Sequence, residues 1–386
     1  MPITLRPDLA GLVPYDPDMR PADVVLTANE NNYGLPAAVR ARVDAALAAV
    51  ETNRYPEATS PALREALGAL WGVPARSVVV GNGGDEIIFN LLLAFGGPTR
   101  PLVTCPPTFS AYELYARLTQ TPVVSVPRTA GFGIDEPAVL AAARSAGIVI
   151  LCSPNNPTSM TVRPAFVAAL AEATDALVMV DEAYGEFADP AASCVPLVAT
   201  HDNVCVLRTL SKAYAMAGAR VGYLVAPDAV ADGMLAVRLP YSVNRFSQAA
   251  ALAVVESAAE LAPVTAAIVA ERGRLAALLD EVAADLAAAG APGMETFPSE
   301  ANFVLVRLPG AGGGDAAAPL PDAHEVHELL ARAGILVRDF SSTAGCEGCL
   351  RVSVGRPAET DALVAELRRI LGLAPRAGRD GGRPTD

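Results

Sequence analysis

The 386-residue chain is short of positive charge: 29 Lys+Arg stand against 42 Asp+Glu, a formal net charge of −13. Without a stripe of basic side chains it cannot neutralise nucleic-acid phosphates, so we exclude a nucleic-acid-binding role. It also lacks a stretch of about 18 apolar residues free of charge, Pro and Gly, so we predict no membrane span. Its first residues have no apolar run behind a positive segment and do not read as a secretory signal. We therefore expect a cytoplasmic protein.

Cysteine and histidine are scarce as well, with six and three residues. Most cysteines lie in or beside apolar runs, where Cys behaves as a small hydrophobe, and we expect a reducing compartment. Cys346 and Cys349 form a CxxC motif. A zinc site needs about four ligands, and no second CxxC or close His pair accompanies the motif. His324 and His327 belong to an amphipathic helical pattern and are interpreted as solvated. The sequence thus predicts no metal site.

Hydrophobic residues make up 52% of the chain, which is typical of a globular protein. At about 100–200 residues per domain, the length favours two domains. Apolar strand-like runs alternate with helical segments from about residue 77 to residue 227. The predicted strands are 77–82, 101–105, 147–152, 176–182, 203–209 and 221–226, and the predicted helices are 85–95, 110–120, 136–147 and 163–175. This alternation indicates an α/β fold with a mostly parallel sheet sandwiched by helices.

After Arg238 the pattern changes to that of a smaller α+β domain. A long helical tract comes first, followed by short strands and two further helices. The predicted elements are helix 247–290, strand 302–308, helix 324–334, strands 335–338 and 350–354, and helix 359–373, with a further helix at 35–50 near the start. We assign 1–45 to an N-terminal arm and part of the small domain, 46–240 to a large cofactor-binding domain, 241–372 to the small domain and 373–386 to a disordered tail.

The segment LRTLSKAYAMAGARVGY combines a lysine with groups that bind phosphate. Lys212 follows a predicted strand directly, among apolar neighbours, and Arg220 follows eight residues later. Burial and a nearby cation lower the pKa of a lysine, which favours the neutral amine that a Schiff base needs. The hydroxyls of Thr209 and Ser211 and the Arg220 guanidinium could together hold one phosphate.

Other polar residues also follow predicted strands. Asp181 ends the run VMVD at the carboxyl end of a strand, where α/β sheets bind ligands, and Tyr184 follows it. A carboxylate there could keep a ring nitrogen protonated, although an Asp in this place could instead cap a helix. Asn156 precedes Pro157, which favours extended backbone and leaves its amide free to donate.

A glycine-rich turn, GNGGDE, joins the strand at 77–82 to the next helix. Such turns present free N–H groups and the positive end of a helix dipole to a phosphate. The turn is neither GxGxxG nor a P-loop, which disfavours dinucleotides and ATP.

Taken together and in order, these motifs resemble the fold-type I pyridoxal-phosphate (PLP) aminotransferases, and among them the histidinol-phosphate aminotransferases. The resemblance extends over nearly the whole chain and is carried by NRYPE, GNGGDE, PPTFSAY, PNNPT, DEAYGEF, RTLSKAYAMAGARVGY, SEANFVLVR and GILVRDF with CLRVSVG. It implies an aspartate-aminotransferase-like fold, PLP as cofactor and a homodimer.

The resemblance also implies roles for single residues. Lys212 would bind the cofactor covalently and then carry the proton between Cα and C4′, while Asp181 pairs with the ring nitrogen. Asn156 and Tyr184 would hydrogen-bond the ring hydroxyl, and Phe109 would stack on the ring. The cofactor phosphate would be held by Gly84, Asp85, Thr209, Ser211 and Arg220, and by Tyr55 of the partner subunit.

For the substrates, the resemblance implies that Arg351 holds the carboxylate. Arg338 would face a substrate phosphate, and Tyr33 and Asn156 would line the substrate pocket. Taken without the resemblance, each arginine could instead form a surface ion pair. The sequence departs from the family pattern at Ser159, where glycine is usual, at Asn32, where proline is usual, and at Met216, where leucine is common.

The implied reaction converts L-histidinol phosphate and 2-oxoglutarate into imidazole acetol phosphate and glutamate. An aromatic-amino-acid aminotransferase and a threonine-phosphate decarboxylase remain alternatives, because both share the cofactor motifs. A non-catalytic relative would be expected to lose Lys212 or Asp181, and both are present.

Overall fold

The central element is a seven-stranded sheet in a computed structural model that describes residues 3–12, 18, 20–291, 293–308, 310 and 320–375. The strand order is β2-β8-β7-β6-β5-β3-β4; β3 to β7 are parallel, and β8 is antiparallel to both its neighbours. The strands are β2 (Val78–Gly81), β3 (Leu102–Thr104), β4 (Val123–Ser125), β5 (Ile148–Cys152), β6 (Leu177–Asp181), β7 (Val204–Thr209) and β8 (Gly222–Val225). All six predicted strands are confirmed. β4 was not predicted, because it is a short edge strand without a buried side chain.

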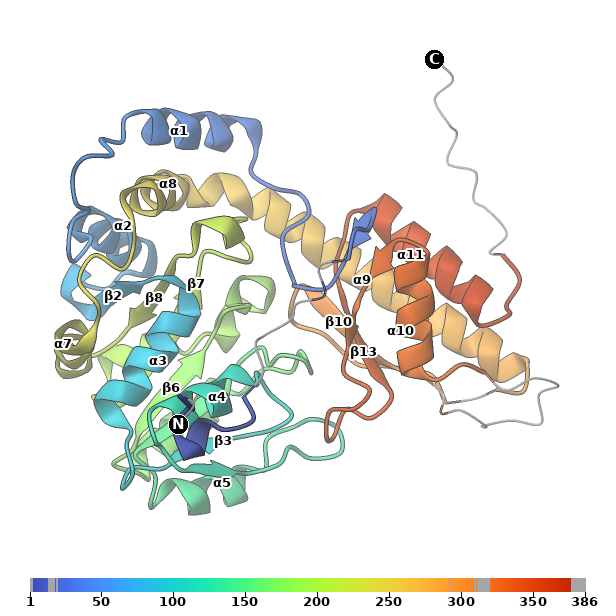
Figure 1. The fold of residues 1–386 in the computed structure, drawn as a ribbon, viewed down its shortest axis with the longest axis horizontal. Coiled ribbons are helices and arrows are strands. Elements are labelled where there is room, and N and C mark those ends of the chain that lie inside the picture. Colours follow the sequence, from blue (N-terminus) through green and yellow to red (C-terminus); the bar gives the residue numbers. More distant parts are fainter. Residues whose placement is uncertain are drawn as a thin grey trace.

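Helices cover both faces of this sheet (Figure 1). Alternate residues of each strand point to opposite faces, so Val178 and Val180 of β6 join one buried cluster while Leu177 and Met179 join another. Because both faces are covered, the strands are continuous apolar runs, which is why they were predictable. The helices of this part are α1 (Ala37–Ala48), α2 (Pro61–Trp71), α3 (Gly83–Phe95), α4 (Ala111–Leu118), α5 (Glu136–Ala143), α6 (Pro164–Glu172) and α7 (Asp228–Val237).

A second, antiparallel sheet has the order β12-β13-β10-β9. Its strands are β9 (Glu295–Thr296), β10 (Phe303–Arg307), β12 (Arg338–Asp339) and β13 (Cys349–Ser353), and its helices are α10 (Ala323–Arg332) and α11 (Pro357–Ile370). β1 (Val24–Val25) pairs in parallel with β11 (Ile335–Leu336), which attaches the N-terminal segment to this part of the molecule. The predicted α+β character of the C-terminal part is confirmed.

The tract predicted as one helical stretch is divided into α8 (Arg245–Val255) and α9 (Ala258–Ala288), which meet at an angle of 80°. α8 packs against α1 and α2, and α9 runs from there to the small sheet (Figure 1). Among the described residues no single helix is long and apolar enough to cross a membrane. The bent pair α8–α9 has sufficient length and apolar composition only when its two helices are taken together. The domain limits stay a prediction, and most of the predicted tail lies outside the described residues.

Single turns of 3-10 helix complete the described elements. They are Pro7–Leu9, Ala75–Ser77, Gly185–Phe187, Pro190–Ala192, Val195–Ala199 and Ala217–Ala219.

A buried cluster of charged side chains lies at the carboxyl ends of β6 and β7. Arg208, whose side chain is 2% exposed, pairs with Glu182 and, at 3.0 Å, with Glu186. The guanidinium also lies 3.9 Å from the Trp71 ring centroid. Burial alone would lower the pKa of Arg208, but the two carboxylates raise it above its ordinary value. Since Glu182 follows Asp181 and Arg208 precedes Thr209, the cluster ties together the two strand ends that carry predicted site residues.

We predict that Arg208→Met lowers the free energy of unfolding by about 3–5 kcal/mol, because it leaves two buried carboxylates without their cation. Arg76→Met is the matched control: Arg76 pairs with Asp228 at 2.8 Å, but the two side chains are 70% and 56% exposed. Losing such a pair leaves stability nearly unchanged. Urea unfolding followed by circular dichroism measures both variants, and equal losses would contradict the importance of the buried cluster.

Candidate active site

The site lies at one edge of the seven-stranded sheet, because parallel strands bring their carboxyl ends together. In the β5–β6 register Cys152 is opposite Asp181, and in the β6–β7 register Asp181 is opposite Leu207. The turns that follow β5, β6 and β7 therefore place Asn156, Tyr184 and Lys212 at the same edge. These three residues were singled out because they follow predicted strands, and the family resemblance implied their roles.

Lys212 is the only lysine in the chain. Its ammonium Nζ donates a hydrogen bond of 2.8 Å to the carbonyl of Ala28 and lies 5.8 Å from the Tyr184 ring centroid. Burial, together with the nearby guanidinium groups of Arg351 and Arg220, lowers its pKa to about 8. The amine is therefore largely neutral at mildly alkaline pH. This uniqueness is a compositional signal that points to the same residue as the motifs.

Asp181 is a buried carboxylate with neutral donors. It accepts hydrogen bonds from the Tyr112 hydroxyl at 2.6 Å and from the Ala183 N–H at 3.0 Å. Burial raises its pKa to about 6, although both donors lower it. A cation placed at this carboxylate would keep it ionised, which fits a protonated ring nitrogen. The next 3-10 turn begins after Tyr184, so Asp181 is not its capping residue. Tyr112 was not predicted, although it lies within the PPTFSAY motif.

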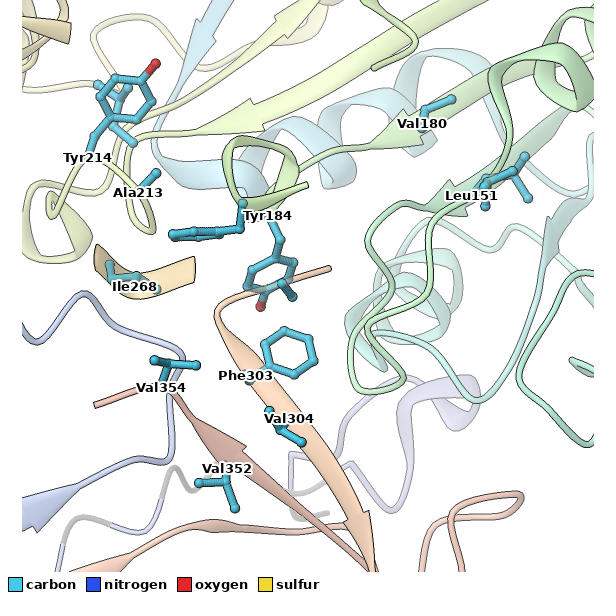
Figure 2. Packing of buried hydrophobic residues seen from close by; sticks show 14 of the residues in the cluster. Leu151, Val180, Tyr184, Ala213, Tyr214, Ile268, Phe303, Val304, Val352 and Val354 are labelled. Atoms are coloured by element: carbon cyan, nitrogen blue, oxygen red, sulfur yellow. The ribbon is translucent and has the colours of Figure 1, made fainter. Parts of the chain in front are cut away.

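Tyr184 connects the two sheets at the site. Its hydroxyl accepts a hydrogen bond of 3.0 Å from the Asn29 amide, and burial raises its pKa to about 12. Its ring meets Phe303 of β10 edge-on, with centroids 5.1 Å apart (Figure 2). Asn29 is a second residue that was not predicted. It also accepts from the Ser353 hydroxyl at 3.0 Å, so it attaches the N-terminal segment to β13.

Arg351 and Asn156, both predicted to bind the substrate, lie in direct contact. The Arg351 guanidinium donates to Asn156 Oδ1 at 2.6 Å and to the carbonyl of Thr27. It is buried and lies 5.3 Å and 5.4 Å from the ring centroids of Phe303 and Phe340. Arg351 is therefore not a surface residue, and the alternative of a surface ion pair is wrong for it.

The start of α3 forms a cradle suited to an anion. Gly83 begins the helix with φ +80°, and a Cβ on it would lie 2.7 Å from Arg220 Nη2. Gly222 of β8 lies against this turn, because a Cβ there would be 2.6 Å from both Gly83 C and Gly84 N. The Thr209 and Ser211 hydroxyl oxygens are 3.0 Å apart. Helix N–H groups, hydroxyls and a guanidinium together fit the phosphate of PLP.

The remaining predicted residues are placed as follows. Asp85 accepts from Arg220 at 3.1 Å in the first turn of α3. The Phe109 ring packs edge-on against the ring of Tyr112, with centroids 5.5 Å apart, and Tyr112 in turn hydrogen-bonds Asp181. Tyr33 is partly buried beside the core, and its carbonyl accepts from Arg356 at 3.4 Å.

The last two predicted residues are Arg338 and Tyr55. Arg338 is half-buried on β12, directly opposite Arg351 in the β12–β13 register. Tyr55 is 80% exposed and stacks on Tyr241 with centroids 4.8 Å apart.

The departures from the family pattern have local explanations. Ser159 is buried with φ +62°, a conformation that explains why glycine is usual there. Asn32 donates to Glu359 at 2.9 Å and so ties its segment to α11. Met216 is buried, as its apolar neighbours predict.

One prediction outside the site is wrong. His324 is exposed as expected, but His327 is only 8% exposed, since it packs between the acidic side chains of Asp18 and Glu328. Cys346 and Cys349 are both buried free thiols, as are the other four cysteines.

Comparisons with known proteins agree with this geometry. The sequence model of the family described as "Aminotransferase class I and II" matches residues 22–367. The histidinol-phosphate aminotransferase of Thermobifida fusca is 41% identical over 364 residues, covering 92% of each chain. That of Paenarthrobacter aurescens is 37% identical, over 97% of this chain and 96% of its own. Among solved structures, histidinol-phosphate aminotransferase from Sinorhizobium meliloti in complex with PLP has a TM-score of 0.83 and 26% identity, over 95% of this chain and 97% of its own.

A sheet edge that gathers the partly buried Lys212, a buried carboxylate and an anion cradle is typical of PLP-dependent enzymes. The chain belongs to the aminotransferase class I and II family. It is a PLP-dependent aminotransferase whose substrates are small molecules, an amino donor and a 2-oxo acid. The predicted fold class, enzyme class and cofactor are confirmed.

We predict that Gly222→Ala weakens PLP binding at least about tenfold, since its Cβ would push the Gly83–Gly84 turn out of the cradle. Gly218→Ala is the matched control, because a Cβ at Gly218 meets no atom within 4 Å. Fluorescence titration of both cofactor-free variants with PLP gives the dissociation constants. Unchanged binding in Gly222→Ala would mean that the cradle does not hold the cofactor.

Proposed function

We propose that this aminotransferase moves the amino group of L-histidinol phosphate to 2-oxoglutarate, giving imidazole acetol phosphate and glutamate. The observation that carries the proposal is the pairing of Arg338 with Arg351 across β12 and β13. Directly opposed residues of antiparallel strands point to the same face, so two guanidinium groups face one site. Such a pair suits one substrate with a phosphate and another with carboxylates. The names of the curated relatives, at 33–41% identity, also support it.

Within the proposal, Lys212 moves the proton, and the residues around it hold the ring. When bound, PLP supplies an aldehyde that takes up the amino group and a ring that accepts the electron pair of the Cα–H bond. The neutral amine of Lys212 holds the cofactor and later moves a proton between Cα and C4′. Asp181 would keep the ring nitrogen protonated, and Asn156 and Tyr184 would form hydrogen bonds with the ring hydroxyl. Phe109 packs on the ring face.

The cofactor phosphate occupies the cradle in this proposal. It is bound by the N–H groups of Gly84 and Asp85, the hydroxyls of Thr209 and Ser211, and the guanidinium of Arg220. On the substrate side, Arg351 binds a carboxylate, Arg338 binds the phosphate of the amino donor, and Tyr33 lines the entrance beside Asn156.

A homodimer is part of the same proposal. Four large apolar side chains near the end of α7 and the start of α8 are exposed: Tyr55, Leu239, Tyr241 and Phe246, at 80%, 68%, 44% and 47%. A second copy that covers them would bring the partner subunit's Tyr55 to the cofactor phosphate. We also propose a cytoplasmic location, which the free thiols of all six cysteines support.

The test is a set of half-reactions followed by the absorbance of the bound cofactor. L-Histidinol phosphate alone should convert the cofactor to its amine form and release imidazole acetol phosphate, and 2-oxoglutarate should restore it. Faster conversion by phenylalanine would instead support an aromatic-amino-acid aminotransferase. Release of carbon dioxide from threonine phosphate would support a decarboxylase. Either result would overturn the proposed substrate while leaving the cofactor site intact.

The two arginines should respond differently in these half-reactions. We predict that Arg338→Gln raises the KM for L-histidinol phosphate about 10–100-fold and affects glutamate less, because a charge-assisted bond to phosphate is lost. Arg351→Gln should impair the glutamate half-reaction by a similar factor. Equal losses for both substrates in both variants would contradict the assignment of one arginine to the phosphate.

A further inference from the structure

A cluster of metal-binding side chains lies outside the site described above. Two of the three histidines in the chain, His324 and His327, lie about one turn apart on α10, and Asp339 of β12 lies beside them. One ligand atom from each of these residues lies within 4.8 Å of the other two. His324 Nδ1 is 2.8 Å from Asp339 Oδ2, and the two imidazole rings stack with centroids 6.2 Å apart. We call these three residues the His–Asp cluster.

His327 is the unusual member, because its ring is buried without satisfying both nitrogens. The side chain is 8% exposed, and Nδ1 makes no hydrogen bond to any described residue. The nearest carboxylate oxygens are Glu328 Oε1, 3.4 Å from Nδ1, and Asp18 Oδ2, 3.6 Å from Nε2. A buried polar atom without a hydrogen bond is rare in folded proteins and calls for a physical explanation such as an ion.

The surroundings of the cluster are acidic. Asp18, Glu328 and Asp339 all lie within 4 Å of one of the two histidines. The guanidinium of Arg20 pairs with Asp18 at 2.7 Å and with Glu328 at 3.0 Å. Carboxylates this close to the two imidazoles favour the approach of a cation.

We propose that the His–Asp cluster binds a divalent transition-metal ion, with Zn²⁺ the best match. Two imidazole nitrogens and one carboxylate oxygen form a donor set that Zn²⁺ favours, with water in the fourth position. Zn–N and Zn–O bonds of about 2.0–2.2 Å require the donor atoms to approach one another to about 3.3 Å. The exposed ring of His324 can make that movement without disturbing the core.

The ion would hold α10 against β12. Successive residues of a strand point to opposite faces, so Asp339 faces the cluster while Arg338 faces the other way. A metal ion bound to Asp339 would therefore hold β12 in place from the face opposite to the Arg338 side chain. Its binding can be measured without any substrate, so the proposal does not depend on the identity of the amino donor.

The test is calorimetric titration of the PLP-loaded enzyme with Zn²⁺. We expect one Zn²⁺ per chain, and an affinity at least about 10–100-fold lower in both His324→Ala and Asp339→Asn. His201→Ala is the matched control, because His201 is the third histidine, its contacts are with Thr200, Leu197 and Glu172, and it is not part of the cluster. In that variant the affinity should be unchanged. Zn²⁺ should also raise the thermal midpoint of the parent enzyme and not that of His324→Ala.

Three results would overturn the proposal. The first is the absence of saturable binding, or binding only at millimolar Zn²⁺, which would identify an adventitious ion. The second is an affinity that His324→Ala leaves unchanged. The third is loss of binding in Cys349→Ser, which would place the ion at the CxxC thiols instead.

Discussion

The structure depends on two ionisable groups at one edge of the sheet, the partly buried amine of Lys212 and the buried carboxylate of Asp181. Neither group is matched by an opposite charge among its hydrogen-bond partners, and burial shifts each pKa toward the neutral form, to about 8 and about 6. The Arg208 cluster then holds the ends of β6 and β7 in register. A cofactor with an aldehyde and a protonatable ring nitrogen would suit both groups at once.

The two arginines proposed to bind the substrates lie on the second sheet, and a few contacts join this part of the molecule to the first sheet. Tyr184 meets Phe303, Arg351 donates to Asn156, and Lys212 donates to the carbonyl of Ala28. Each contact joins a turn at the carboxyl ends of the large sheet to the small sheet or to the N-terminal segment. The N-terminal segment takes part through Ala28 and Asn29, which hydrogen-bond Lys212 and Tyr184.

The parts of the fold that could be predicted are those whose local sequence determines the outcome. The buried strands between residues 77 and 226 are apolar runs bounded by turns, and Lys212, Asp181 and Asn156 follow from their ends. Edge strands such as β4 lack this signal. The bend between α8 and α9 falls at Glu256 and Ser257, whereas Pro263 lies inside α9, so no breaker residue marks it. Tyr112, Asn29 and the burial of His327 depend on contacts with residues distant in the sequence, which no local pattern reports.

The most direct test is the pH dependence of the rate at which the cofactor-free protein binds PLP covalently. Lys212 is the only lysine, so the parent protein and Lys212→Ala differ in a single side-chain amine. Subtracting the rate measured for Lys212→Ala from that of the parent removes any contribution of the α-amino group. Only the neutral amine reacts, so the rate should fall about tenfold per pH unit below the pKa and level off above about 8. A rate that still rises above pH about 10, as for a solvated lysine, would contradict the account.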